Sequence, residues 1–260
     1  MSIKTATLNG VATIEIARPE KKNALTVAMY QAMADALVAA KADPTVRAVL
    51  ITGQPGVFTS GNDIEDFMSR GRDGLGSDGD AMDTPVIRFM RALLDCDKPV
   101  LAAVTGAAIG IGTTMLLHCD FVYVSDEARL AMPFVALGLV PEFASSLVVP
   151  QLMGHRRAAE KLLLGDPFTP EQAVECGIAN AVLPAGEVVN HARRIAERFN
   201  QLPPGAVREA QRLMRSPQQA QLLETIRTEV GIFASRLRSP EAMEAFQAFF
   251  QKRRPDFSKF

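Results

Sequence analysis

A strand–strand–helix pattern recurs along this chain and restricts its fold more than any other feature. Residues 5–8 and 11–17 are predicted as two strands joined by the turn Asn9-Gly10, and Thr26 then begins an apolar helical pattern. From residue 187 onward the pattern is helical, with breaks expected at Pro203-Pro204, Pro217 and Pro240. We therefore expect an α/β fold in which a spiral of such units (residues 1–200) precedes a C-terminal helical region (residues 201–260).

Short apolar runs and helix-start residues predict the other elements. Thr26 is a plausible N-cap for the first helix, whose buried face should carry Met29, Met33, Leu37 and Val38. Thr169-Pro170-Glu171 should start another helix. A mobile loop rich in Gly and Asp is expected at residues 70–83. Further strands are expected at residues 47–52, 100–104, 121–124 and 178–183, and helical segments at residues 63–67, 86–94 and 147–164.

The charge and cysteine content exclude several classes of function. The formal net charge is −1, and no basic stripe indicates nucleic-acid binding. Residues 99–117 are uncharged, but their glycines and threonines favour a buried strand, a turn and a buried helix over a membrane span. The N-terminus has no apolar signal-peptide region, so a cytoplasmic protein is expected. Three widely spaced cysteines indicate reduced thiols and no metal site: Cys96, Cys119 and Cys176.

Glu142 is the single acid between Ala128 and Ala159, inside the apolar run Leu-Val-Pro-Glu-Phe-Ala. Burial of an isolated carboxyl raises its pKa, which suits a general base that removes a carbon-bound proton. A second interpretation is structural. Glu142 precedes a helix that Ser145 and Ser146 should open, where a negative charge favours the helix N-terminus. These residues alone leave both interpretations open.

Two glycine-containing turns each separate a buried strand from a helix, at residues 58–63 and 106–112. Backbone N–H groups at such turns suit an oxyanion, and two turns from separate strands can converge on one oxygen. The alternatives are a turn capped by Asp63 and close packing through glycines. The second turn lacks the third glycine of a dinucleotide-binding fingerprint, and the chain has no phosphate-binding loop or serine nucleophile motif.

Three cations lie in the segment Arg18-Pro19-Glu20-Lys21-Lys22-Asn23-Ala24-Leu25, between a strand and a helix. Such a cluster suits the phosphates of a nucleotide-like carrier. The alternative is a charged, solvated loop.

Several segments together resemble the enoyl-CoA hydratase/isomerase (crotonase) superfamily, in order and over nearly the whole chain. These are Arg18-Pro19 to Asn23-Ala24-Leu25, residues 98–106, the Gly110 turn, Cys119-Asp120, residues 163–169, Ala173 and Gly177-Ile178. The resemblance implies a spiral of ββα repeats with C-terminal helices that build a homotrimer or a dimer of trimers. It also implies an acyl-CoA thioester as substrate, with coenzyme A as part of that substrate and no separate cofactor.

The resemblance also implies roles for individual residues. The thioester oxygen would lie between the backbone N–H groups of Asn62 and Ile111. The CoA and acyl path would be lined by Lys22, Ala24, Leu25, Ser60, Gly61, Asn62, Asp63 and Ile64. Two C-terminal positions would reach the CoA of a neighbouring subunit, namely Phe249 and Lys252.

The resemblance separates two activities. Hydratases of this superfamily use two glutamates, whose positions align with Thr114 and Phe134. Glu142 instead matches the single catalytic glutamate of the peroxisomal type of Δ3,Δ2-enoyl-CoA isomerase. We therefore expect a stand-alone isomerase that converts 3-enoyl-CoA to 2-enoyl-CoA. The alternatives are a hydratase or another acyl-CoA enzyme of the superfamily, or a non-catalytic acyl-CoA- or RNA-binding member.

Overall fold

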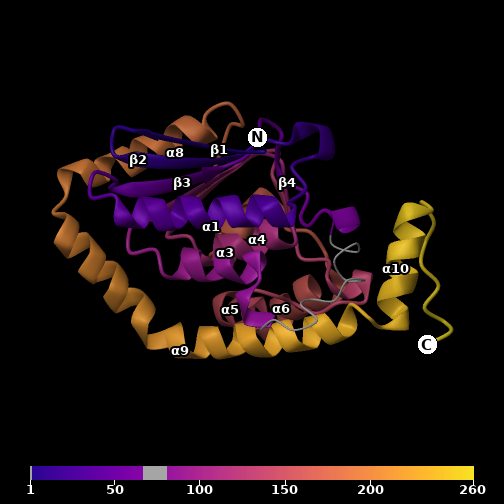
Figure 1. Cartoon of the computed structure of the whole chain (residues 1–260). Helices are drawn as coiled ribbons and strands as arrows, with labels where there is room; N and C mark the ends of the chain where they lie inside the picture. The colour runs from indigo at the N-terminus through magenta and orange to yellow at the C-terminus, as the bar shows by residue number, and fades with distance from the viewer. Residues whose placement is uncertain (1, 67–80) are drawn as a thin grey trace.

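The computed structural model describes residues 2–66 and 81–260 and shows two β-sheets with helices around them (Figure 1). The larger sheet has six strands in the order β1-β2-β3-β5-β7-β9. Its β1 and β2 form an antiparallel hairpin, and every other neighbouring pair is parallel. The strands are β1 (Ile3–Leu8), β2 (Val11–Ile16), β3 (Ala48–Thr52), β5 (Val100–Val104), β7 (Phe121–Ser125) and β9 (Ala181–Leu183).

The smaller sheet is parallel and has the order β4-β6-β8. Its strands are β4 (Val57–Thr59), β6 (Ala107–Ile109) and β8 (Arg129–Ala131). Each of them directly follows a strand of the larger sheet, and a helical segment comes next along the chain. This repetition confirms the predicted α/β fold built from ββα units. Sequence patterns missed the three short strands, because three residues are too few to show alternation.

The helices follow the expected order along the chain. Within the first two thirds they are η1 (Pro19–Lys21), α1 (Val27–Ala42), η2 (Ala81–Asp83), α3 (Pro85–Leu94), α4 (Ile111–Thr114), η3 (Met115–His118), η4 (Val135–Leu137), α5 (Ser145–Met153) and α6 (His155–Ala159). The π-helical turn η5 (Glu160–Leu164) follows α6, and the rest are α7 (Pro170–Glu175), α8 (Val188–Glu197), η6 (Arg198–Gln201), α9 (Pro204–Arg236) and α10 (Pro240–Phe250). Among the described helices, none combines the length and apolar character required to cross a bilayer.

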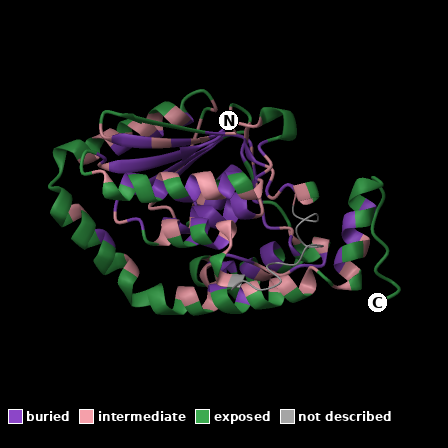
Figure 2. Cartoon of the chain, viewed as in Figure 1, coloured by how far each residue is buried: buried purple, intermediate pink, exposed green. Residues whose placement is uncertain are grey.

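The core lies on both faces of the larger sheet. Strands β3 and β5 are buried along their whole length, as expected for parallel strands covered on two sides (Figure 2). On one face, Leu50 and Leu101 pack against Val188 and Ala192 of α8. On the other face, α1 and α3 belong to a larger apolar cluster that extends to the smaller sheet.

The structure corrects four sequence predictions. Pro217 does not end a helix, because α9 continues through it while buried residues on either side anchor the helix. Val38 is 59% exposed, since it lies to one side of the buried stripe of α1. Residues 107–109 form β6 instead of part of a turn, and the last strand forms only over Ala181–Leu183. Most of the predicted loop at residues 70–83 lies outside the described residues, and its last three form η2.

Candidate active site

The smaller sheet brings the two predicted turns together. Strands β4 and β6 are parallel neighbours, so the segments that follow them leave the same edge of the sheet. Gly61 lies in the first turn with φ +94°, and a Cβ atom added to it would lie 3.0 Å from the carbonyl oxygen of Ile109. Glycine therefore allows the first turn to contact Ile109, the last residue of β6, which directly precedes Gly110.

The main chain of Asn62 is oriented by Leu25, with which it forms a parallel β-bridge. The N–H of Leu25 donates to the carbonyl of Gly61 (2.8 Å), and the N–H of Asp63 donates to the carbonyl of Leu25 (2.9 Å). These two hydrogen bonds flank Asn62, so its own N–H points away from Leu25. Within the described part of the chain, no acceptor is recorded for that N–H.

The second N–H belongs to Ile111, the first residue of α4. Gly110 precedes it with φ 58° and ψ −119°, a conformation essentially restricted to glycine. The first N–H groups of a helix have no carbonyl partner within the helix. Hydrogen bonding in α4 begins with the N–H groups of Thr113 and Thr114, which donate to the carbonyl of Gly110. Ile111 therefore offers a second backbone donor beside the first turn.

The N-terminal segment is tied to these turns by Asn23, which is fully buried. Its Oδ1 accepts from the N–H of Arg18 (2.7 Å), and its Nδ2 donates to the carbonyls of Val57 and Phe58. The N–H of Ser60 donates to the carbonyl of Lys22 (3.1 Å). Lys22, Leu25 and Ser60–Asn62 are thus adjacent. That they line a path for CoA remains a prediction.

One cation of the predicted phosphate-binding cluster and one residue of the predicted path are engaged with each other. Arg18 forms an ion pair with Asp63 (Nη1 to Oδ2, 2.6 Å), so Arg18 is not a free cation for a phosphate. Asp63 also accepts from the N–H groups of Glu65 and Asp66, as the alternative interpretation of the first turn requires. Its role in binding CoA remains a prediction. Lys21 and Lys22 are exposed, and Lys21 also pairs with Glu65 at 3.5 Å.

Glu142 is 7% exposed, and Oγ1 of Thr114 donates to its Oε1 at 3.3 Å. The pKa of its carboxyl is raised to about 8 by burial and then by the charge of Glu229, against the hydrogen bond from Thr114. The raised pKa expected from the sequence is confirmed. Thr114, which donates to this carboxylate, lies one helical turn after Ile111 in α4.

The N-terminus of α5 is capped by another acid. Glu229 on α9 accepts from the N–H groups of Ala144 (2.6 Å) and Ser146 (3.1 Å) and from the hydroxyl of Ser146. The side chain of Glu142 makes its recorded hydrogen bond with Thr114 instead. The recorded hydrogen bonds therefore assign the capping of α5 to Glu229 and not to the carboxylate of Glu142.

The backbone directly after Glu142 is strained. Phe143 and Ala144 both lie in the left-handed region, with φ 57° and 56°. Each such non-glycine residue costs on the order of 1–3 kcal/mol and persists only where surrounding contacts impose it. His118 Nε2 lies 2.7 Å from the carbonyl oxygen of Phe143, and burial lowers the pKa of His118 to about 4. The imidazole is thus neutral and donates this hydrogen bond.

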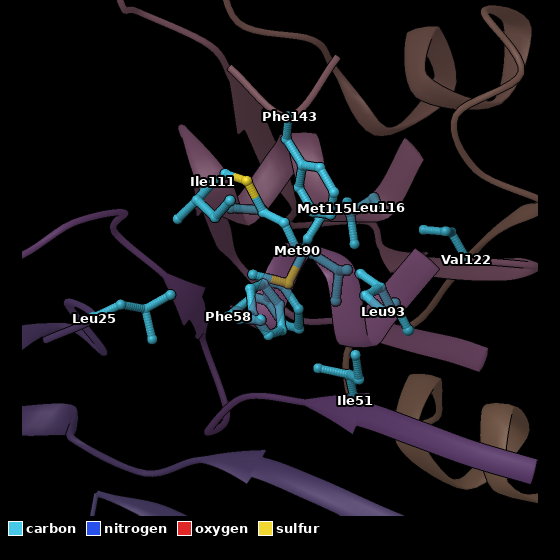
Figure 3. Close-up of a cluster of buried hydrophobic side chains, with 14 of the residues drawn as sticks. Leu25, Ile51, Phe58, Met90, Leu93, Ile111, Met115, Leu116, Val122 and Phe143 are labelled. Atoms are coloured by element: carbon cyan, nitrogen blue, oxygen red, sulfur yellow. The ribbon is translucent and has the colours of Figure 1, made fainter. Parts of the chain in front are cut away.

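The surroundings of Glu142 are mainly apolar. Ile111 and Phe143 belong to a buried cluster with Met90 and Met115 (Figure 3). The phenol of Tyr30 donates to Oδ1 of Asn62, and the charge of Glu142 adds to burial in raising the pKa of that phenol well above its ordinary value. Tyr30 is therefore hydrogen-bonded to Asn62 and close enough to Glu142 for its charge to act on the phenol.

The two positions expected to carry glutamates in a hydratase hold other groups. Thr114 donates its hydroxyl to Glu142, and Phe134 is buried with its ring edge-on to Phe233 (centroids 6.5 Å apart). A Cβ atom added to Gly110 would lie 3.7 Å from the Phe134 ring. Phe134 thus contacts the second turn as an apolar group.

Phe249 lies in the last turn of α10 and Lys252 two residues beyond its end, and both are exposed. The helix itself packs closely against Gly138, at the end of η4, as an added Cβ there would lie 2.7 Å from the N atom of Ala242. No recorded contact of the described chain joins Phe249 or Lys252 to Asn62 or Ile111. Their predicted role toward a neighbouring subunit remains a prediction.

Sequence reasoning missed Tyr30 and Glu229. Glu229 shares a helical stripe with Ile226, Val230 and Phe233, and an acid within such a stripe is the signal that marks it. Tyr30 gave no comparable signal, because it follows Met29 on the apolar face of α1 and reads as core.

Comparisons with known proteins agree with this geometry. The family described as Enoyl-CoA hydratase/isomerase matches residues 6–259. The chain is 33% identical over 244 residues to Enoyl-CoA delta isomerase 2 of Rattus norvegicus, covering 94% of this chain and 62% of that protein. It is also 33% identical over 258 residues to Enoyl-CoA hydratase ACTT3 of Alternaria alternata, covering 96% of this chain and 83% of that protein.

Solved structures extend the likeness to the fold. Pseudomonas aeruginosa OdaA is 53% identical with a TM-score of 0.91, covering 95% of this chain and 98% of that one. An enoyl-CoA hydratase/isomerase from Pseudoalteromonas atlantica is 39% identical with the same TM-score, covering 99% and 100% of the two chains. With nearly its whole length matched and its paired turns beside a buried glutamate, the chain belongs to the enoyl-CoA hydratase/isomerase family.

Proposed function

We propose that the protein is a Δ3,Δ2-enoyl-CoA isomerase in which Glu142 is the one acid–base group. The observation that carries this proposal is the environment of Glu142. Burial and the charge of Glu229 raise the pKa of this carboxyl to about 8. The carboxyl accepts a hydrogen bond from Thr114, which occupies a position where a hydratase would carry a glutamate. A base with a pKa near the working pH is efficient in proton transfer from carbon.

The proposed reaction uses the two backbone donors. The thioester oxygen of a 3-enoyl-CoA accepts hydrogen bonds from the N–H groups of Asn62 and Ile111. Glu142 takes a proton from C2, the C2–H electron pair moves toward the carbonyl, and a dienolate forms. The donors stabilise its oxygen, each contributing about 3 kcal/mol, and proton transfer by the base adds roughly 10²–10⁴-fold in rate.

The second half of the reaction returns the same proton. Glu142 delivers it to C4, and the double bond moves from C3–C4 to C2–C3, in conjugation with the thioester. One carboxylate suffices because C2 and C4 flank the same carbon. Phe134 supports this reaction over hydration, because a buried apolar side chain does not activate water.

Glu229 does not supply the second acid that hydration requires. Its two carboxylate oxygens are occupied by the N–H of Ala144 and by the N–H and hydroxyl of Ser146. These contacts of Glu229 hold the start of α5. Of the two acids, Glu142 is the one that is hydrogen-bonded to α4, through Thr114. The hydratase named among the relatives makes hydration the competing activity.

The proposal includes the substrate carrier and assembly implied by the family. Exposed Lys21 and Lys22 next to the first turn suit the phosphates of CoA. Exposed apolar side chains on α9 and α10 support a homotrimer or a dimer of trimers, in which such surfaces are covered: Leu213, Met214, Met243, Phe249 and Phe250.

The test compares two reactions in one enzyme. We expect turnover of 3-enoyl-CoA and, with 2-enoyl-CoA as substrate, little 3-hydroxyacyl-CoA. Glu142→Gln should lower isomerase turnover by at least about 10²-fold while acyl-CoA binding stays within threefold of wild type, because the two N–H donors remain. Glu171→Gln, at an exposed site on α7, is the matched control. Efficient hydration by the wild type, or near-normal isomerase turnover in Glu142→Gln, contradicts the proposal.

A further inference from the structure

Glu229 lies on α9, 87 residues after Glu142, yet its carboxylate contacts the backbone turn that follows Glu142. It is 6% exposed, and its Oε2 accepts from the N–H of Ala144 at 2.6 Å. Its Oε1 accepts from the N–H of Ser146 at 3.1 Å and from the Ser146 hydroxyl. All three recorded hydrogen bonds are accepted, and they favour the ionised carboxylate against burial, which raises the pKa of Glu229.

These hydrogen bonds act on the strained part of the backbone. Phe143 and Ala144 are both left-handed, and Ala144 is fully buried. Without Glu229, the N–H of Ala144 would be buried and without this hydrogen bond, which is unfavourable. His118 holds the carbonyl of Phe143 from η3, on the other side of the same peptide unit. The direction in which the Glu142 side chain leaves the backbone therefore depends on both contacts.

We propose that Glu229 is a positioning residue for Glu142: its carboxylate fixes the Phe143–Ala144 turn, which directly follows Glu142 in the chain. A negative charge held at this place also acts on the proton of Glu142. This inference rests on the proposed role of Glu142 as the base. It extends that role by assigning the orientation and proton affinity of the base to a residue that does not touch the substrate.

The ionisable groups around the turn come from three elements. Tyr30 on α1 and His118 on η3 are neutral near pH 7, because burial raises the pKa of the phenol well above its ordinary value and lowers that of the imidazole to about 4. Arg215 acts on His118 in the same direction as burial. Burial raises the pKa of Glu142, and the charge of Glu229 on α9 raises it further. Burial also raises the pKa of Glu229 itself, against the hydrogen bonds from Ser146 and Ala144 to Glu229. Removal of the Glu229 charge should lower the pKa of Glu142.

Two variants separate the charge from the reach of the side chain. Glu229→Gln keeps the length and removes the charge, so the acidic limb of the kcat–pH profile should move to lower pH by about one unit. Glu229→Asp keeps the charge and is one methylene shorter. The acidic limb of the kcat–pH profile should therefore stay at the same pH, while kcat falls by about tenfold because the Phe143–Ala144 turn is held less firmly. KM should change less than threefold in both. Glu224→Gln, exposed on the same helix, is the control.

A second readout does not require turnover. Protein labelled with ¹³C at the glutamate carboxyl carbons gives an NMR titration of Glu142, assigned by the signal that Glu142→Gln lacks. We expect the midpoint to be lower in Glu229→Gln than in wild type. An unchanged midpoint together with unchanged kcat overturns the inference. If the wild type lacks isomerase activity, the proposed function fails, and this titration still decides whether Glu229 controls the Glu142 proton.

Should Glu229→Gln fail to fold, Ser146→Ala tests the same contact more gently. It removes one of the three donors to Glu229 and leaves both backbone N–H groups in place. A fall in kcat of about threefold with unchanged KM is expected. Unchanged kcat in this variant, with an unchanged Glu142 midpoint, counts against Glu229 as a positioning residue.

Discussion

Replacing Glu142 with Gln is expected to make the protein more stable at alkaline pH. Burial, followed by the charge of Glu229, raises the pKa of this carboxyl from 4.5 to about 8 against the hydrogen bond from Thr114. The folded chain therefore keeps a proton that the unfolded chain releases. Gln is close to the protonated carboxyl in shape and retains an oxygen that accepts from Thr114.

Proton linkage determines the direction in which the free energy of unfolding changes with pH. Because the pKa of Glu142 is higher in the folded state, the folded state binds more protons between the two values. The stabilising contribution of the protonated group is complete below the unfolded pKa and is lost as the pH rises through the folded pKa. At 1.36 kcal/mol for each unit, the full loss is on the order of 4–5 kcal/mol.

Urea unfolding of both proteins, from about pH 5 to about pH 9, measures this effect. The free energy of unfolding of wild type should fall relative to that of Glu142→Gln as the pH rises, with the two curves closest at the acidic end. Glu229 and every other ionisable group are common to both proteins, so their contributions largely cancel in the difference. Parallel curves across this range would refute the electrostatic description of Glu142.

Two further predictions concern residues around the turns. Tyr30→Phe removes the hydroxyl that donates to Asn62. In steady-state kinetics, kcat should fall by about threefold to thirtyfold with little change in KM. An unchanged kcat would mean that Asn62 does not need this contact. The double variant Lys21→Ala, Lys22→Ala should raise KM for acyl-CoA by about tenfold with kcat unchanged, and the difference from wild type should shrink in high salt. A KM that does not respond would remove these lysines from the CoA site.

The sequence indicated the parts of the site that depend on local patterns. The lone acid at Glu142, the glycines of the two turns and the start of α5 all appear within short segments. The repeated strand–strand–helix order also predicted the architecture. Each of these features is determined by neighbouring residues, so a single chain reveals it without knowledge of tertiary contacts.

The rest of the site depends on contacts between distant segments. Arg18 and Asp63 are 45 residues apart, and their ion pair changes a predicted phosphate ligand into a structural group. Glu229 reaches Ala144 across 85 residues. The left-handed backbone at Phe143 and Ala144 has no glycine or asparagine to mark it, because the surrounding hydrogen bonds impose it. Such features become visible only when the fold is known.

The most direct test of the central claim follows the hydrogen that Glu142 is proposed to move. A 3-enoyl-CoA deuterated at C2 is incubated with wild type or Glu142→Gln, and the position of the label is read by NMR. Wild type should remove one deuterium from C2 as the double bond moves, whereas Glu142→Gln should leave both in place. Loss of deuterium from C2 at the wild-type rate in Glu142→Gln would contradict the assignment of Glu142 as the base.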